Sequence, residues 1–229
     1  LTTDNTHFYS RLILRGSGWQ TVLLGNTGKQ MVDFTGSYQN MIQDMRFGVS
    51  GSATNPSTIG VFFHRGADTT QCIYHRLSNV YMDMRSNPAA NNGVGTVGIW
   101  NVEGENHNYH NVYINANRAM VMTKYPTGLA YSPTSYVSLY TSQISCGSNV
   151  VTGDSVFVGW DRHFPPIYLD GVTHCDLGSA YINNQLSPYS VALGSYNFGI
   201  QVKDAFQLKH FGLVEGVNQY MRLTRTLIA

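Results

Sequence analysis

The feature that most constrains the fold is a short motif that returns about every 33 residues. In each copy a polar residue is followed by an apolar residue, a variable residue and, in most copies, a second apolar residue. A near-constant period with one strand-like segment per copy is typical of repeat proteins, in which no unit can bury its apolar face alone. The six copies begin at Asp44, Asn79, Asn111, Gln143, Asp176 and His210.

Each period has room for three short strands. Further strand-like segments precede the motif, at 31–34, 60–63 and 98–101, and others follow it, as at 119–122. Three strands per period, each pairing with its equivalent in the next period, describe one coil of a parallel β-helix. We therefore predict an all-β fold, a single parallel β-helix domain over residues 1–229 with about six to seven coils.

An antiparallel sandwich or barrel is the alternative, because it also needs many short strands. Such folds use two-residue hairpin turns, and the sequence has Asn-Gly or Asp-Gly pairs only at 92–93 and 170–171. Insertions near 86–96 and 145–166 interrupt the period, and we expect them to form loops on one face. Strand-forming sequence continues over 221–228, so we expect the chain to be part of a longer polypeptide.

The charge pattern excludes several classes of partner. Charged residues make up 12% of the chain, the net charge is +1, and basic residues form no run. Nucleic acids and anionic membranes require concentrated positive charge, so we expect neither as a partner. No apolar stretch approaches the roughly 20 residues that cross a bilayer, so we expect no membrane insertion.

The sequence predicts no metal site and no cofactor. It contains no phosphate-binding glycine loop and no zinc pattern. Its three cysteines, Cys72, Cys146 and Cys175, are odd in number and lack metal-ligand spacing, so we interpret them as free thiols that fill space.

Alternation within the motif predicts which side chains point inward. We expect two inward stacks, formed by Met45, Val80, Val112, Ile144, Leu177 and Phe211 and by Phe47, Met82, Ile114, Cys146, Ser179 and Leu213. The repeated polar residues should form an outward row. The outward residues beside that row are candidates for ligand binding.

Aromatic rings with polar neighbours suit a sugar, because ring faces stack on its apolar surface while polar groups bond its hydroxyls. The candidate binding residues are Arg46, Tyr81, Tyr113, Asn115 and, in the longer insertion, Trp160. The alternative interpretation is that these residues only stabilise the outer face or pack against another subunit.

Glycoside hydrolysis requires two carboxyl groups roughly 5–9.5 Å apart. Asp44 and Asp83 are predicted on neighbouring repeats and could meet this requirement if both side chains turn toward each other. Asp161, beside Trp160, is the third candidate for an acid, base or nucleophile. A solvated loop is the alternative for Asp161.

The sequence resembles the right-handed parallel β-helix of the pectate-lyase-like superfamily, and within it the tailspike or depolymerase proteins of bacteriophages. The resemblance rests on 12–19 with 21–25, on 31–36 and 43–47, and on the Asn-apolar-Tyr-apolar copies at Asn79 and Asn111. It covers nearly the whole chain as a pattern, without a shared catalytic motif.

This resemblance implies a homotrimer on the virion, assembled in the host cytoplasm, that binds a bacterial capsule or O-antigen polysaccharide. It implies depolymerisation of that polysaccharide, for which we expect glycoside hydrolysis. The alternatives are a non-catalytic receptor-binding or structural spike segment and a polysaccharide lyase.

Overall fold

In the computed structural model the chain is all-β. The structure describes residues 11–25, 30–49, 59–65, 72–84, 96–102, 104–116, 118–123, 137–140, 143–146, 166–172, 174–184, 198–204, 207–215 and 219–224. These ranges contain no helix, and so no helix long and apolar enough to cross a membrane. Most of the predicted insertions near 86–96 and 145–166 lies outside these described ranges.

The strands are β1 (Ile13–Arg15), β2 (Val22–Gly25), β3 (Gln30–Asp33), β4 (Met41–Val49), β5 (Ile59–His64), β6 (Cys72–Ile73), β7 (Arg76–Asp83), β8 (Val97–Val102), β9 (Gly104–Glu105), β10 (His107–Ala116), β11 (Arg118–Thr123), β12 (Val137–Tyr140), β13 (Gln143–Cys146), β14 (Ile167–Asp170), β15 (Cys175–Asp176), β16 (Tyr181–Asn184), β17 (Phe198–Lys203), β18 (Leu208–Lys209), β19 (Val214–Glu215) and β20 (Gln219–Thr224).

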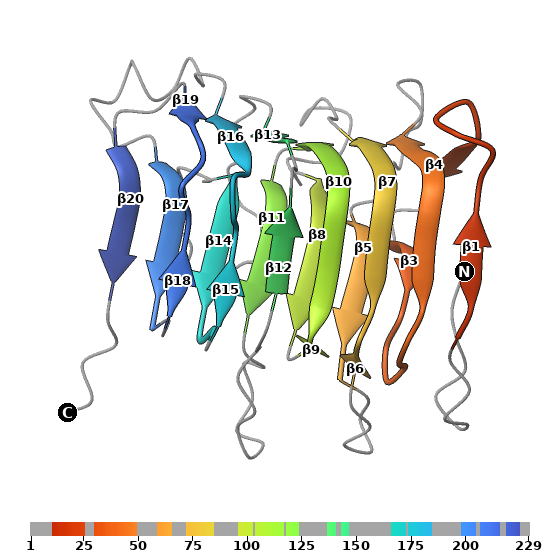
Figure 1. The fold of residues 1–229 in the computed structure, drawn as a ribbon, viewed down its shortest axis with the longest axis horizontal. Helices are drawn as coiled ribbons and strands as arrows, with labels where there is room; N and C mark the ends of the chain where they lie inside the picture. Colours follow the sequence, from red (N-terminus) through yellow and green to blue (C-terminus); the bar gives the residue numbers. More distant parts are fainter. Residues whose placement is uncertain are drawn as a thin grey trace.

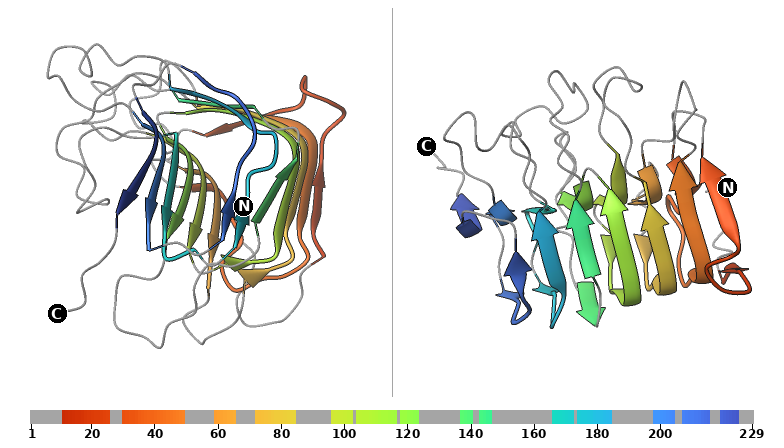
Figure 2. Two further views of the ribbon diagram at one scale, coloured as in Figure 1. Left: turned by 60° about the vertical axis from the view of Figure 1, so that its left-hand side comes forward. Right: turned by 90° about the horizontal axis from the view of Figure 1, so that it is seen from above.

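Two large parallel sheets contain most of these strands. The first sheet has the order β1-β4-β7-β10-β12-β15-β18. It also includes β2, which pairs with β4, and β13, β16 and β19, which pair in that order starting from β10. The second sheet has the order β20-β17-β14-β11-β8-β5-β3. Figure 1 shows the strands side by side in chain order along the long axis, and Figure 2 shows the two sheets facing each other. The predicted all-β parallel pairing is confirmed for the described strands, and the antiparallel alternative is wrong.

The strand register confirms the first three copies of the repeat. Met45 pairs with Val80, and Val80 pairs with Val112, so the polar residues that precede them lie level with one another. The prediction for the later copies is wrong, because Gln143 pairs with Tyr113 and lies two residues away from the level of Asn111. A shift of two residues keeps every side chain on the same face, so the apolar alternation could not reveal it.

The last two copies also leave the predicted row. Asp176 pairs with Ser138, which is level with Asn108, and Lys209 rather than His210 pairs with Asp176. As a consequence Ser179, Phe211 and Leu213 are exposed, where inward positions were predicted; Phe211 is 75% exposed.

The core lies between the two sheets. In the first three copies the predicted inward residues are buried, with Met45, Val80 and Val112 in one column. Phe47, Met82 and Ile114, the matching residues two positions later, have no exposed surface. Each such side chain contributes about 1.5–3 kcal/mol through removal of apolar surface from water.

Part of the outer face of the second sheet is buried as well. Val97, Val121 and Tyr168 form a second apolar cluster there, and Phe62 and Trp100 pack against it. Parallel sheets are commonly covered on both faces. The outer face of the first sheet is half-exposed over β4, β7 and β10, so a ligand has access to it.

Two histidines lie in an aromatic column inside the core. The ring of His75 stacks on Phe34 and on His107, with centroids 5.2 and 5.1 Å apart, and Phe63 lies 4.5 Å from His107. His75 accepts a hydrogen bond from the Asn40 backbone N–H at 3.2 Å, which leaves its other nitrogen to donate to the Ser37 carbonyl at 3.0 Å.

His107 differs, since neither of its ring nitrogens has a hydrogen bond within the described part of the chain. Burial lowers the pKa of His75 to about 3. It also lowers the pKa of His107, with His75 as a second cause. Both rings are therefore neutral in the folded protein at neutral pH.

We expect the histidine column to make the fold acid-sensitive. Below pH 6.5 the unfolded chain binds protons at both histidines that the folded chain excludes, so stability falls as the pH drops towards 3. The free energy of unfolding falls by about 1.4 kcal/mol for each histidine with every pH unit of acidification in this range. His107→Phe should remove one of these contributions without loss of stability at pH 7.5. Urea unfolding at pH 7.5 and 4.5 measures both effects.

His75→Phe is the matched variant. It also removes one histidine that the unfolded chain protonates and the folded chain does not. In addition it leaves the Asn40 N–H and the Ser37 carbonyl without the His75 ring as a partner, which lowers the free energy of unfolding by about 1–3 kcal/mol. An unchanged pH dependence in His107→Phe would contradict the assignment of His107 as a buried neutral ring.

Candidate functional site

A row of left-handed residues bends the long strands of the first sheet. Asp44, Asn79 and Asn111 have φ values of 55°, 54° and 50° within β4, β7 and β10. Aspartate and asparagine tolerate this conformation better than other non-glycine residues. The Asn79 amide donates to Asp44 Oδ1 at 3.0 Å, and the Asn111 amide donates to Asn79 Oδ1 at 2.8 Å. We call these three residues the polar ladder.

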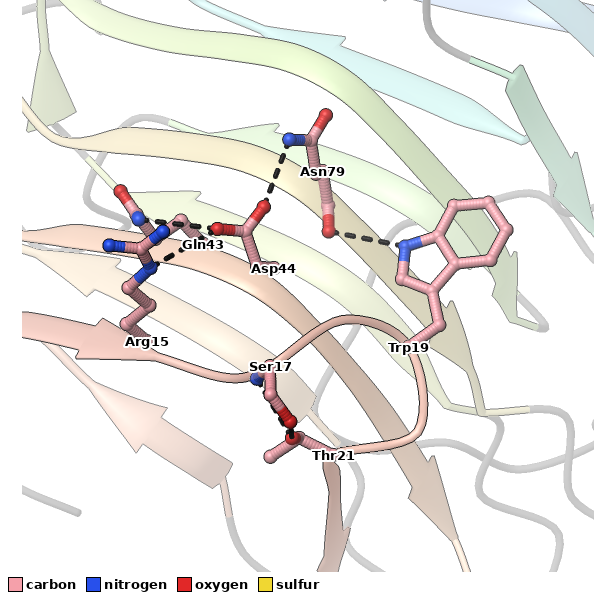
Figure 3. Close-up of polar contacts among 7 residues, drawn as sticks. All are labelled: Arg15, Ser17, Trp19, Thr21, Gln43, Asp44 and Asn79. Atoms are coloured by element: carbon pink, nitrogen blue, oxygen red, sulfur yellow. Dashed lines mark hydrogen bonds and ion pairs between the residues drawn. The ribbon is translucent and has the colours of Figure 1, made fainter.

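Asp44 ends the polar ladder and has further partners (Figure 3). Its Oδ2 lies 3.4 Å from Arg15 Nε and accepts a hydrogen bond from the Gln43 amide at 3.3 Å. Both carboxylate oxygens are therefore engaged, one by the polar ladder and one by a cation. This carboxylate, a candidate for catalysis from the sequence, has a structural role in these contacts.

Asp83 lies elsewhere on the same face, against Arg46. The Arg46 guanidinium is 3.0 Å from Asp83 Oδ2, and its carbon lies 5.1 Å from the centre of the Tyr81 ring. Asp83 pairs with Gly48, the fourth residue after Asp44. Asp44 and Asp83 thus lie at different levels of the sheet and contact different arginines, and their use as a catalytic pair stays a prediction.

The aromatic candidates stack on one another. Tyr81 and Tyr113 pair across β7 and β10, with ring centroids 4.5 Å apart and planes 21° apart. Trp19 approaches Tyr81 from the other direction, at 5.4 Å and 34°. Tyr81 is thus held between Tyr113 on one side and Arg46 with Trp19 on the other. A sugar needs a ring face that neighbours leave open, and Trp19, which is 50% exposed, presents more surface than Tyr81.

The loop between β1 and β2 carries Trp19 across the sheet. Gly16 and Gly18 donate backbone hydrogen bonds to the carbonyls of Gln43 and Asp44, at 3.0 and 2.9 Å. Gly18 has φ 106°, which glycine adopts without strain. The indole N–H of Trp19 then donates to the Asn79 carbonyl at 3.2 Å, as Figure 3 shows. The loop is thereby fixed to β4 and β7.

Sequence reasoning missed Trp19, although a tryptophan within a glycine-rich turn is a signal for an exposed aromatic side chain. It also missed Tyr181 and Glu215, because the later copies are shifted. Tyr181 pairs with Gln143, which pairs with Tyr113, so Tyr181 continues the tyrosine row. Its hydroxyl donates to Glu215 at 2.5 Å, and this bond is the main cause of the raised pKa of Tyr181.

The remaining candidates do not join the exposed group. Asn115 is level with Asp83, as predicted, but only 6% of it is exposed. Trp160 and Asp161 lie outside the described residues. Within the described ranges, no group of three or more His, Cys, Asp or Glu side chains is arranged to hold a metal ion.

We call the half-exposed group of Trp19, Arg46, Tyr81, Asp83 and Tyr113 the aromatic face. It combines one open indole surface with hydrogen-bonding groups that are already fixed by neighbours. Such an arrangement suits a ligand with both apolar faces and hydroxyl groups. It does not contain a described pair of carboxylates set for acid–base chemistry.

We expect Asp44→Ala to destabilise the fold by about 2–3 kcal/mol, because alanine disfavours the left-handed conformation and the ladder loses a hydrogen bond. Asp44→Asn keeps an oxygen for Asn79 and tolerates the same φ, so its cost should stay below about 1 kcal/mol. Urea unfolding at pH 7.5 compares the two. Equal losses in both variants would contradict the structural role of Asp44.

The chain matches no protein-family model, no curated protein and no solved structure.

Proposed function

We propose that the chain forms coils of a right-handed parallel β-helix in a bacteriophage tailspike and that it binds a bacterial surface polysaccharide. Parallel pairing and a chain that alternates between two sheets support the β-helix. Crossover connections between parallel strands are right-handed in nearly all proteins, which supports the handedness. In this proposal the protein belongs to the virion tail and assembles as a homotrimer in the host cytoplasm.

The observation that carries the binding proposal is the half-exposed Trp19, held by its indole hydrogen bond beside the Arg46–Asp83 pair. An indole fixed in position loses little conformational freedom when a sugar ring stacks on it. Neighbouring charged groups supply donors and acceptors for the sugar hydroxyls. The ligand we propose is capsule or O-antigen polysaccharide.

Hydrolysis by this chain stays a prediction. Asp44 and Asp83 are each paired with a different arginine, so these two carboxylates favour binding over bond cleavage. Asp161 remains the third candidate. Lyase chemistry also stays an alternative from the sequence.

We expect Trp19→Ala to weaken polysaccharide binding about tenfold or more, because it removes the open stacking surface. Trp19→Phe should retain part of the affinity, since it keeps a ring and loses only the indole hydrogen bond. Binding is measured by biolayer interferometry against immobilised capsule and O-antigen polysaccharides. Tyr74→Ala, which removes another exposed aromatic side chain, is the matched control and should bind normally.

The proposal fails if wild-type protein binds none of these polysaccharides, or if Trp19→Ala and Tyr74→Ala bind as the wild type does. The same incubations are assayed for new reducing ends and for unsaturated uronate absorbance. Reducing ends that disappear in Asp83→Asn or Asp161→Asn would place hydrolysis in this chain, whereas polysaccharide that stays intact would support binding alone.

A structural role in the trimer is a second candidate, and one observation favours it. Val22 and Leu24 point outward from β2 beside Arg46 and Gly48, and Leu24 is 66% exposed. A Cβ atom added at Gly48 would lie 3.4 Å from the Leu24 side chain, so Leu24 covers that glycine. Apolar surface beside aromatic rings and an arginine is also typical of subunit contacts.

If this surface is the subunit contact, Leu24→Asp should convert trimer to monomer, because a carboxylate would be buried without a partner. Light scattering coupled to gel filtration measures the mass. Leu223→Asp, on the edge strand β20 of the other sheet, is the control. A trimer that persists in Leu24→Asp would exclude this contact.

A further inference from the structure

We infer that the polysaccharide bound at the aromatic face carries no net negative charge: it is a neutral or amino-substituted glycan rather than one rich in uronate or other acidic sugars. This inference rests on the proposed function and adds the chemical class of the ligand. It follows from the partners of the charged side chains around the face.

The arginine of the aromatic face, Arg46, and the arginine beside the polar ladder, Arg15, both have carboxylate partners. Arg46 lies 3.0 Å from Asp83, and Arg15 lies 3.4 Å from Asp44. A ligand carboxylate would have to compete with Asp83 for Arg46, and success would leave a half-buried carboxylate without its cation. The Arg46 guanidinium is thus already paired with a carboxylate of the protein itself.

Arg46 is further restricted by its contact with the Tyr81 ring, at 5.1 Å. A guanidinium between a carboxylate and an aromatic ring is held by both, so turning it toward a ligand loses two favourable contacts. Arg76, which is exposed, lies level with Asn108 on the other side of the polar ladder from Tyr81 and Tyr113.

The charged group that continues this face toward the later strands is negative. Glu215 is exposed and accepts the hydroxyl hydrogen bond of Tyr181, which continues the row of Tyr81 and Tyr113. Asn183 donates to the same hydroxyl at 3.1 Å. Along the described rows that run through Tyr81 and through Asp83, one arginine, Arg46, stands against two carboxylates, Asp83 and Glu215, so a polyanion laid along these rows would be repelled.

Hydroxyl groups and ring faces remain as the features that this surface can recognise. Trp19 offers an indole surface, while the amides of Asn111 and Asn183 and the hydroxyl of Tyr181 offer polar groups along the rows. Amides both donate and accept hydrogen bonds, which matches sugar hydroxyls. An ammonium group on an amino sugar would be accepted beside Glu215.

The test uses chemically matched ligands. Purified bacterial polysaccharides of known composition, neutral and uronate-containing, are immobilised together with carboxyl-reduced forms of the acidic ones. We expect binding to neutral polysaccharides and, where an acidic one is recognised, tighter binding after its carboxylates are reduced. Affinity for the neutral polysaccharides should change less than about twofold between 50 and 500 mM NaCl, because they offer no charge attraction for salt to screen.

Tightest binding to an acidic polysaccharide, lost on carboxyl reduction and lowered about tenfold or more by salt, would overturn the inference. If that binding also depended on Trp19, the proposed function would stand while the charge class was wrong. Absence of binding to every polysaccharide would refute the proposed function itself. The two failures are therefore distinguishable.

Discussion

The polar ladder is the interaction on which the rest of the outer face depends. Asp44, Asn79 and Asn111 bend their strands at the same level and bond one another side chain to side chain. Because the register of a parallel sheet decides which side chains become neighbours, this alignment also aligns the residues that follow. Arg46, Tyr81 and Tyr113 meet because they lie two positions after the ladder.

Alignment of like residues has a cost for ligand binding. Rings stacked at the strand spacing use their faces on each other, so the tyrosine row stabilises the sheet more than it displays stacking surface. The loop between β1 and β2 restores such surface by laying Trp19 over the end of the row. The ion pairs also limit what a ligand can contact. They pair Arg15 and Arg46 with carboxylates of the protein, so the ligand is left with uncharged groups to bind.

The sequence was enough to predict parallel strands and the buried columns through Met45 and Phe47, because apolar alternation and period report burial directly. It was not enough for Gln143, since a two-residue shift preserves that alternation. Nor could it show that Asp44 and Asp83 contact different arginines, which depends on the register of the strands. The contact of Trp19 with Asn79 spans 60 residues and depends on the path of a loop.

The loop that carries Trp19 precedes the first copy of the repeat and bonds both to that copy, at Gln43 and Asp44, and to the second copy, at Asn79. In a linear array each repeat is held mainly by its immediate neighbours. A ligand that binds only when Trp19 is seated would therefore hold this loop against β4 and β7. By thermodynamic linkage, glycan binding and resistance of the loop to local opening would rise together.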